Sequence, residues 1–201
     1  MDKDQNTEQR ILAAAKQAFM EKGLAGARMQ DIADKAGINK ALLHYYFRSK
    51  DKLFEVIFME AAAEFLPRIS ALMFSDQPLF EKIEGFVNEY IGMILKNPYL
   101  PLFILNEMNR QPQPFIKKLW GAKRPPVERL AEQIEQEVKR GNIKPIHPAH
   151  FMMNMVAMCM FPFIARPMVQ WIHKLDEKQF LELMEQRKKE VAKFIIDSIR
   201  K

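Results

Sequence analysis

The chain has 201 residues and a formal net charge of +6; 48% of its residues are hydrophobic and 28% are charged. This length allows one or two domains with a full hydrophobic core, and the composition excludes a wholly disordered chain. The single cysteine excludes an intramolecular disulfide and a cysteine-ligated zinc or iron–sulfur site. We therefore expect a protein of a reducing compartment. We also predict neither a bound metal nor another cofactor.

The sequence also indicates whether the chain is secreted or spans a membrane. Charges occur throughout the N-terminal segment, which lacks a small-residue cleavage site and so does not resemble a signal peptide. The longest apolar stretch, residues 151–164, is shorter than the roughly 20 residues that cross a bilayer. We therefore predict a cytoplasmic protein that does not enter a membrane.

An all-α fold is predicted. Glycines are few, with seven in the chain, and no run of alternating apolar and polar residues is bounded by turn signals. Pro67 is expected to kink or split the helix that contains it. Apolar spacing and capping residues predict helices over residues 7–22, 29–36, 40–47, 50–75, 79–96, 98–110, 114–120, 126–140, 148–173 and 177–200.

The segment 29–54 has the turn and capping residues that are typical of a helix-turn-helix. A tight turn containing Gly37 separates two short helices, and Asn39 is a candidate N-cap of the second helix. Leu43 and Phe47 can point into a small core together with residues of the first helix. The opposite face of the second helix carries cations, an imidazole and a phenol among small residues, which suits a helix in a DNA major groove. These residues are Lys40, Ala41, His44, Tyr45 and Arg48.

Charge is concentrated in the same segment. Residues 28–52 hold six basic and three acidic residues, a net charge of +3. The backbone amides of residues 50–52 begin a helix after Ser49, and a helix N-terminus beside Lys50 is a phosphate-binding feature.

This segment resembles the TetR family of transcriptional regulators, whose helix-turn-helix has the pattern D-I-A-x-x-A-G-(V/I)-x-x-x-x-L-Y-x-Y-F-x-x-K-x-x-L. The resemblance covers roughly residues 7–55, and the upstream Ala18, Phe19 and Gly23 agree with it. The matching residues of the motif are Asp31, Ile32, Ala33, Ala36, Gly37, Ile38, Leu43, Tyr46, Phe47, Lys50 and Leu53.

The resemblance implies a three-helix DNA-binding domain in residues 1–50 and a larger helical ligand-binding and dimerisation domain in residues 51–201. It implies a homodimer on a palindromic operator, released by a small molecule. The recognition helices would enter successive major grooves about 34–36 Å apart. The DNA-binding residues expected from periodicity and resemblance are Arg28, Gln30, Asn39, Lys40, Ala41, Leu42, His44, Tyr45, Tyr46 and Lys50.

Three positions depart from the family pattern. Arg28 stands where a Ser or Thr usually caps the first helix of the motif, and it can reach a phosphate or a minor-groove edge instead. Leu42 replaces a Thr, so a hydroxyl–phosphate bond is lost. His44 replaces the tyrosine that often contacts a phosphate.

A methionine-rich run, residues 151–161, is apolar all round, which predicts burial by its own domain and by a second subunit. Because methionine adapts to varied shapes, this region is a candidate pocket for a small apolar effector. Core packing or a dimer interface is the simpler explanation of the same pattern. Asn154 is expected to be a buried amide with a partner. The candidate pocket residues are Phe103, Trp120, Phe151, Asn154, Met155 and Met158.

The last two predicted helices, residues 148–173 and 177–200, can form half of a four-helix bundle across a two-fold axis. An intramolecular bundle is the alternative. Cys159 is expected to be a small buried hydrophobe, and His147 and His150 polar residues at a helix start rather than metal ligands.

Catalytic patterns are missing from the sequence, which has neither a Gly-rich phosphate loop nor GxSxG. We therefore predict that the chain is not an enzyme. The predicted function is a ligand-responsive regulator, most often a repressor in this family. The alternative is a helical small-molecule sensor or carrier that acts through a protein partner.

Overall fold

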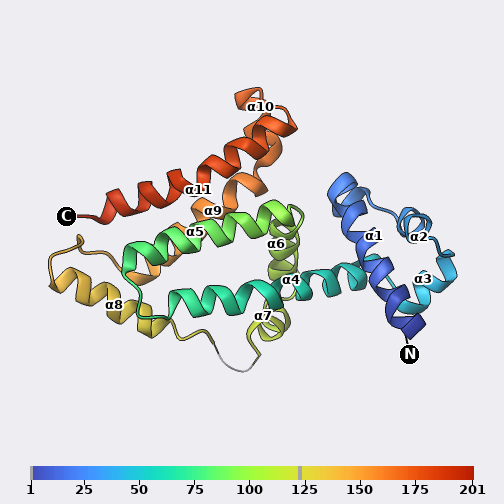
Figure 1. The fold of residues 1–201 in the computed structure, drawn as a ribbon, viewed down its shortest axis with the longest axis horizontal. Coiled ribbons are helices and arrows are strands. Elements are labelled where there is room, and N and C mark those ends of the chain that lie inside the picture. The colour runs from blue at the N-terminus through green and yellow to red at the C-terminus, as the bar shows by residue number, and fades with distance from the viewer. Residues whose placement is uncertain (1, 122–123) are drawn as a thin grey trace. The chain divides into compact units, whose positions relative to one another are not determined.

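The computed structural model describes residues 2–121 and 124–201, with side chains from residue 6 onward. These residues form eleven helices and no strand, which confirms the predicted all-α fold. Figure 1 shows their order along the chain. The helices are α1 (Asp2–Gly26), α2 (Met29–Ala36), α3 (Lys40–Tyr46), α4 (Lys50–Met73), α5 (Leu79–Lys96), α6 (Leu100–Arg110), α7 (Pro112–Trp120), α8 (Val127–Lys139), α9 (Pro148–Ile164), α10 (Arg166–His173) and α11 (Glu177–Ile199).

The chain divides into two compact units, Met1–Glu64 and Phe65–Lys201. The first unit contains α1 to α3 and the first part of α4. Phe54 of α4 is fully buried, with its ring edge-on to Phe19 of α1 at 4.9 Å. Because these turns of α4 complete the small core, the first compact unit extends further than the 1–50 segment of the predicted DNA-binding domain.

The first helix is longer than predicted. It begins at Asp2 and extends to Gly26, but Gly23 has the non-helical angles φ 67° and ψ 173°. Regular helical geometry therefore stops at Gly23, next to the predicted end at residue 22, and residues 24–26 follow before α2.

Two prolines have different effects on their helices. α4 continues through Pro67 as one helix and is not split. The predicted helix 148–173 is wrong, because it divides into α9 and α10, which are bent by 71° at Ala165. Pro167 stands in the first turn of α10 and lacks the N–H that would bond back to the end of α9, so the helix breaks there.

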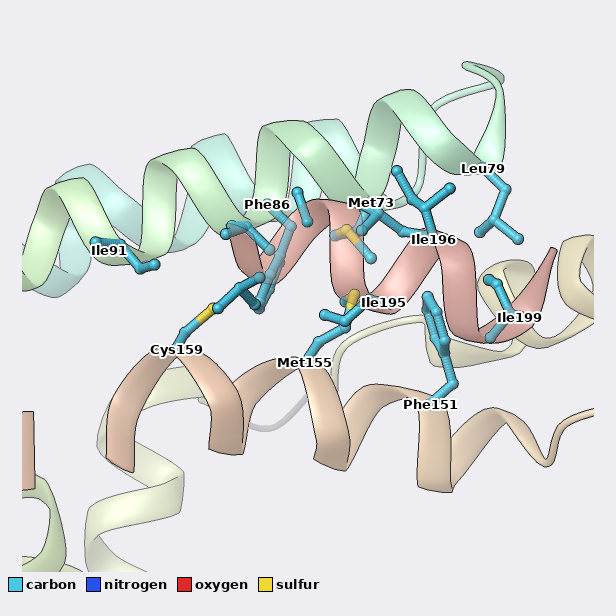
Figure 2. Close-up of a cluster of buried hydrophobic side chains, with 14 of the residues drawn as sticks. Met73, Leu79, Phe86, Ile91, Phe151, Met155, Cys159, Ile195, Ile196 and Ile199 are labelled. Atoms are coloured by element: carbon cyan, nitrogen blue, oxygen red, sulfur yellow. The ribbon is translucent and has the colours of Figure 1, made fainter. Parts of the chain in front are cut away.

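The core of the second unit lies between α5, α9 and α11. Figure 2 shows Phe151, Met155 and Cys159 on the side of α9 that faces α5 and α11. All three α9 residues are at most 1% exposed. This burial stabilises the unit by removing a continuous apolar surface from water.

The other face of α9 is exposed within one chain. Met153 and Phe161 are each 56% exposed, and Asn154 is also exposed. One side of the methionine-rich run, with Asn154, is therefore not buried by its own chain, and its predicted burial depends on a second subunit or a ligand.

Among the described residues, no single helix combines the length and apolarity needed to cross a membrane. α9 and α10 meet those criteria only when joined across their 71° bend. This is weak support for a span, since α9 is a core helix with one buried side.

Candidate nucleic-acid interface

The turn between α2 and α3 is built on Gly37. Its φ of 65° and ψ of 38° lie in the left-handed region, which glycine adopts without a Cβ penalty. The amide of Gly37 donates to the Asp34 carbonyl at 3.1 Å, and the amide of Ile38 donates to the Ala33 carbonyl at 3.1 Å. These bonds end α2 and redirect the chain into α3.

α3 begins where Asn39 caps it. The amide of Leu42 donates to Asn39 Oδ1 at 2.8 Å, which confirms the predicted N-cap. This bond satisfies one of the amides that a helix start leaves without a helical acceptor. The capping oxygen of Asn39 is therefore occupied within the motif, although its side chain is exposed.

The two faces of α3 have opposite environments. Leu43 is fully buried and anchors the helix to the small core, while Tyr45 on the other side is 81% exposed. Tyr46 is half-buried, and its ring lies edge-on to Tyr45 at 5.6 Å. The outward face predicted to meet DNA is therefore open: Lys40, Ala41, Leu42, His44, Tyr45 and Arg48 are all exposed.

The side chains near the start of α2 are also exposed. Arg28 precedes α2 and makes no side-chain capping bond, as predicted. Gln30 donates to Asp34 Oδ1 at 2.8 Å. The Lys22 ammonium lies 2.6 Å from Asp31 Oδ2, and this bond lowers the pKa of the Asp31 carboxyl.

Half of the cations in residues 28–52 are already engaged. Lys35 pairs with Glu21 at 3.1 Å and Lys52 pairs with Glu55 at 2.9 Å. The Lys50 ammonium donates to the carbonyls of Ala27 and Ala25, at 3.0 Å and 3.3 Å. In the described part of the chain, the remaining three are exposed and make no ion pair with a carboxylate: Arg28, Lys40 and Arg48.

Arg10 has a role that the sequence did not reveal. Its Nη2 donates to the Ala36 carbonyl at 2.5 Å and lies 3.5 Å from the Gly37 carbonyl. A cation at the C-terminus of α2 binds carbonyls that have no helical donor. Local patterns could not predict this contact, because it joins residues 26 positions apart.

The six candidate pocket residues lie in different environments. Phe151 and Met155 belong to the core of the second unit, and Met158 is half-buried with its carbonyl bonded to Arg187. Asn154 lies on the exposed side of α9, away from the core. Phe103 of α6 packs edge-on to Phe115 of α7, with ring centres 6.3 Å apart, and Trp120 is 40% exposed.

Two further residues with distinctive chemistry, His147 and Cys159, take part in the structure of α9. His147 Nδ1 accepts from the amide of Ala149 at 3.2 Å and so caps the start of α9. Cys159 is buried, and burial raises the pKa of its thiol to about 12. Over the residues that the structure describes, no group of three or more His, Cys, Asp or Glu could hold a metal ion.

Comparison with known families and proteins agrees with this geometry. The model of the bacterial regulatory proteins of the tetR family matches residues 11–57, which cover most of α1, the helix-turn-helix and the start of α4. Members of that family are DNA-binding transcriptional regulators, usually repressors.

Two curated relatives come from Escherichia coli strain K12. The HTH-type transcriptional regulator RutR is 28% identical over 144 residues, which are 70% of this chain and 66% of RutR. The HTH-type transcriptional regulator UidR is 29% identical over 145 residues, which are 70% of this chain and 71% of UidR. The matched part therefore spans about two thirds of the length of these relatives.

The fold also has solved counterparts. A transcriptional regulator of the TetR/AcrR family from Thermobifida fusca superposes with a TM-score of 0.64 at 20% identity, over 98% of this chain and all of that chain. At this identity the likeness shows a shared fold, with a helix-turn-helix followed by a helical C-terminal part.

Proposed function

We propose that this chain, which belongs to the tetR family of bacterial regulatory proteins by its N-terminal unit, binds a palindromic operator as a homodimer and represses transcription until a small apolar molecule releases it. The observation that carries the proposal is the open face of α3. Its inner side is anchored by Leu43, its start is capped by Asn39, and its outer side presents polar and aromatic groups to solvent.

The proposed DNA contacts fall into two chemical classes, contacts with phosphates and contacts with bases. Lys40, Arg48 and Arg28 are exposed cations and suit phosphates. His44 and Tyr45 are exposed on the same face of α3 and suit base edges in the major groove. Ala41 between them allows close approach of the helix to the bases.

The homodimer is supported by the outer faces of the last long helices. Met153 and Phe161 of α9 and Phe194 of α11 are 56%, 56% and 61% exposed. Large apolar side chains exposed along two helices mark a surface for association. A second copy of the same surface would bury them in a four-helix arrangement, with the two recognition helices related by the same two-fold axis.

The effector is proposed to be apolar because the core of the second unit contains adaptable side chains. Met155 and Phe151 lie in its core, and methionine repacks around varied shapes at low cost. α4 continues from the first unit beyond Glu64, so one helix connects the proposed effector region to the DNA-binding unit.

The test is the salt dependence of DNA binding. A fluorescent mixed-sequence duplex should be bound at about 50 mM salt, with affinity falling steeply toward 200 mM as counterions return to the phosphates. Lys40→Ala with Arg48→Ala should weaken binding and flatten the salt dependence by about 0.9 for each phosphate that the variant no longer neutralises. Lys178→Ala, which removes an exposed lysine of α11, is the matched control and should change neither quantity.

Two results would contradict the proposal. One is the absence of any binding to duplex DNA at low salt. The other is binding that the double variant and the control weaken equally, because the contacts would then not depend on α3. A chain that binds small apolar molecules but no DNA would instead agree with a sensor that acts through a protein partner.

A further inference from the structure

Arg187 of α11 binds a carbonyl of α9 that a proline has left without its helical donor. Pro162 lies four residues after Met158 and has no N–H, so the Met158 carbonyl cannot receive the usual backbone bond of a helix. Arg187 supplies donors instead, with Nε at 3.2 Å and Nη2 at 3.1 Å from the Met158 oxygen. The guanidinium is therefore fixed where α11 lies against α9.

The charge of Arg187 is not compensated within its own chain. Arg187 is half-buried, and in the part of the chain that the structure describes it makes no ion pair with a carboxylate. Glu190, one turn further along α11, is exposed and has no ion-pair partner among the described residues either. A half-buried cation has lost part of its solvation, and a carboxylate brought to it from outside the chain would offset that loss.

Large apolar side chains flank this cation and this anion on α11. Leu183 lies four residues before Arg187, and Phe194 lies four residues after Glu190. Steps of four, three and four residues place all four side chains on one face of the helix, which we call the α11 stripe. Leu183 and Phe194 are 39% and 61% exposed, so the core of the second unit does not cover the stripe.

The α11 stripe is complementary to itself when the direction of the helix is reversed. In a two-fold dimer, each residue of one copy meets the same partner residue twice. An antiparallel pair of α11 helices, with the axis between residues 188 and 189, places Arg187 against Glu190 of the partner subunit. It also places Leu183 against Phe194 of the partner subunit. A parallel pair would instead place Arg187 against the partner's Arg187, and like charges at an interface are costly.

We propose that the homodimer forms in one register, in which the two α11 helices pack antiparallel and Arg187 binds Glu190 of the partner subunit. This inference rests on the proposed function, because it specifies contacts of the proposed homodimer. Nε and Nη2 of Arg187 bind the Met158 carbonyl, which leaves Nη1 for the carboxylate. Since the guanidinium is held in place before association, less side-chain entropy is lost when the dimer forms.

Exchanging the two charges between separate chains tests this register. Glu190→Arg places like charges opposite each other twice in its homodimer, and Arg187→Glu does the same with the opposite sign. Each variant alone should therefore have a dimer Kd raised by about tenfold or more. A mixture of the two variants restores both complementary pairs, so the heterodimer should form at least about fivefold more tightly than either homodimer. Sedimentation equilibrium with a fluorescent label on one variant measures these constants.

Glu182→Arg is the matched control for the charge change. Glu182 is an exposed glutamate of α11 outside the stripe, where it pairs with Lys178 at 3.8 Å. This variant should dimerise as the unmodified chain does and should show no preference for the Arg187→Glu chain. Arg187→Glu also removes the bond to the Met158 carbonyl. If that variant does not fold, Pro162→Ala is added to it, because alanine restores a helical amide for the carbonyl.

The proposal is overturned if Glu190→Arg dimerises as tightly as the unmodified chain. It is also overturned if Glu190→Arg and Arg187→Glu form no more heterodimer than Glu182→Arg and Arg187→Glu do. In both cases the unmodified chain is still a dimer, so only the register is contradicted. An unmodified chain that stays monomeric at every concentration would contradict the homodimer of the proposed function, and with it this register.

Discussion

Gly37 has the backbone conformation on which the turn of the helix-turn-helix depends. Its φ of 65° lies in a region that side chains with a Cβ adopt only under strain. A Cβ at this position would also lie 3.1 Å from Arg10 Nη2, the group that binds the end of α2. One glycine therefore determines both the turn and the room for its stabilising cation.

Gly37→Ala should lower the free energy of unfolding by about 1 kcal/mol or more, because alanine is strained at positive φ. Urea denaturation followed by circular dichroism measures this change. Gly92→Ala is the control: Gly92 is within α5 and its added Cβ would meet only the far end of Lys188, at 3.8 Å or more. That variant should be neutral or stabilised by up to about 1 kcal/mol, since alanine favours helix. Equal losses in both variants would show that the turn is not the cause.

At the scale of elements, α3 shows how far local sequence determines a functional helix. Asn39 caps it, Gly37 precedes it and Leu43 anchors it, and all three roles follow from residue type and spacing. α2 and α5 were predicted to the residue for the same reason. By contrast, the hydrogen bonds that Arg10 and Lys50 donate to backbone carbonyls join residues 23 to 27 positions apart. No local pattern predicts such bonds.

The split between α9 and α10 shows a different limit of prediction from the sequence. Apolar residues continue across Ala165, so periodicity favoured one long helix, while Pro167 removed a backbone donor and the bend of 71° followed. The exposure of Asn154 could not be predicted either, because an apolar run does not reveal which of its faces the rest of the chain covers.

Asn39 is a cap and also a predicted DNA contact, and substitution can separate the two roles. Asn39→Ala should lower the stability of the N-terminal unit by about 1 kcal/mol, because the Leu42 amide loses its acceptor. Asn39→Ser restores a capping oxygen and should recover most of that loss in thermal unfolding. If both variants bind duplex DNA equally weakly despite different stabilities, Asn39 contacts DNA directly. Equal stability of the two variants would argue against the cap.

A buried lysine links α5 to α8 in the second unit. Lys82 is 2% exposed, and its ammonium donates at 2.6 Å both to the Ser75 carbonyl and to Gln133 Oε1. Burial lowers the pKa of Lys82, since the charged form loses solvation. The two acceptors thus compensate a desolvated charge.

Gln133→Met should therefore destabilise the chain by about 1–3 kcal/mol, because the ammonium loses an acceptor that methionine cannot replace. Chemical denaturation monitored by tryptophan fluorescence measures the change. Gln136→Met, at an exposed position of the same helix, is the control and should stay within about 0.5 kcal/mol of the unmodified chain. A loss no larger than that of the control would show that Gln133 does not stabilise the charge of Lys82.

At the scale of the whole molecule, the proposed homodimer depends on the outer faces of α9 and α11. Phe161→Glu places a charge on the proposed interface and should shift the chain from dimer to monomer in sedimentation velocity experiments, because a buried unpaired carboxylate is costly. Leu102→Glu changes a residue of α6 with similar exposure, 52%, and should leave the dimer intact. A chain that is monomeric before any substitution, or a dimer that survives Phe161→Glu, would place the interface elsewhere.

Selection from a pool of randomised DNA duplexes tests the central claim most directly. The unmodified chain should enrich a palindromic sequence whose half-sites lie one helical turn, about 10–10.5 base pairs, or a multiple of it apart. A chain with Lys40→Ala and Tyr45→Ala should enrich no such sequence, while the Lys178→Ala control should enrich the same palindrome as the unmodified chain. Enrichment of no sequence by the unmodified chain, or of the same palindrome by the double variant, would contradict operator recognition through α3.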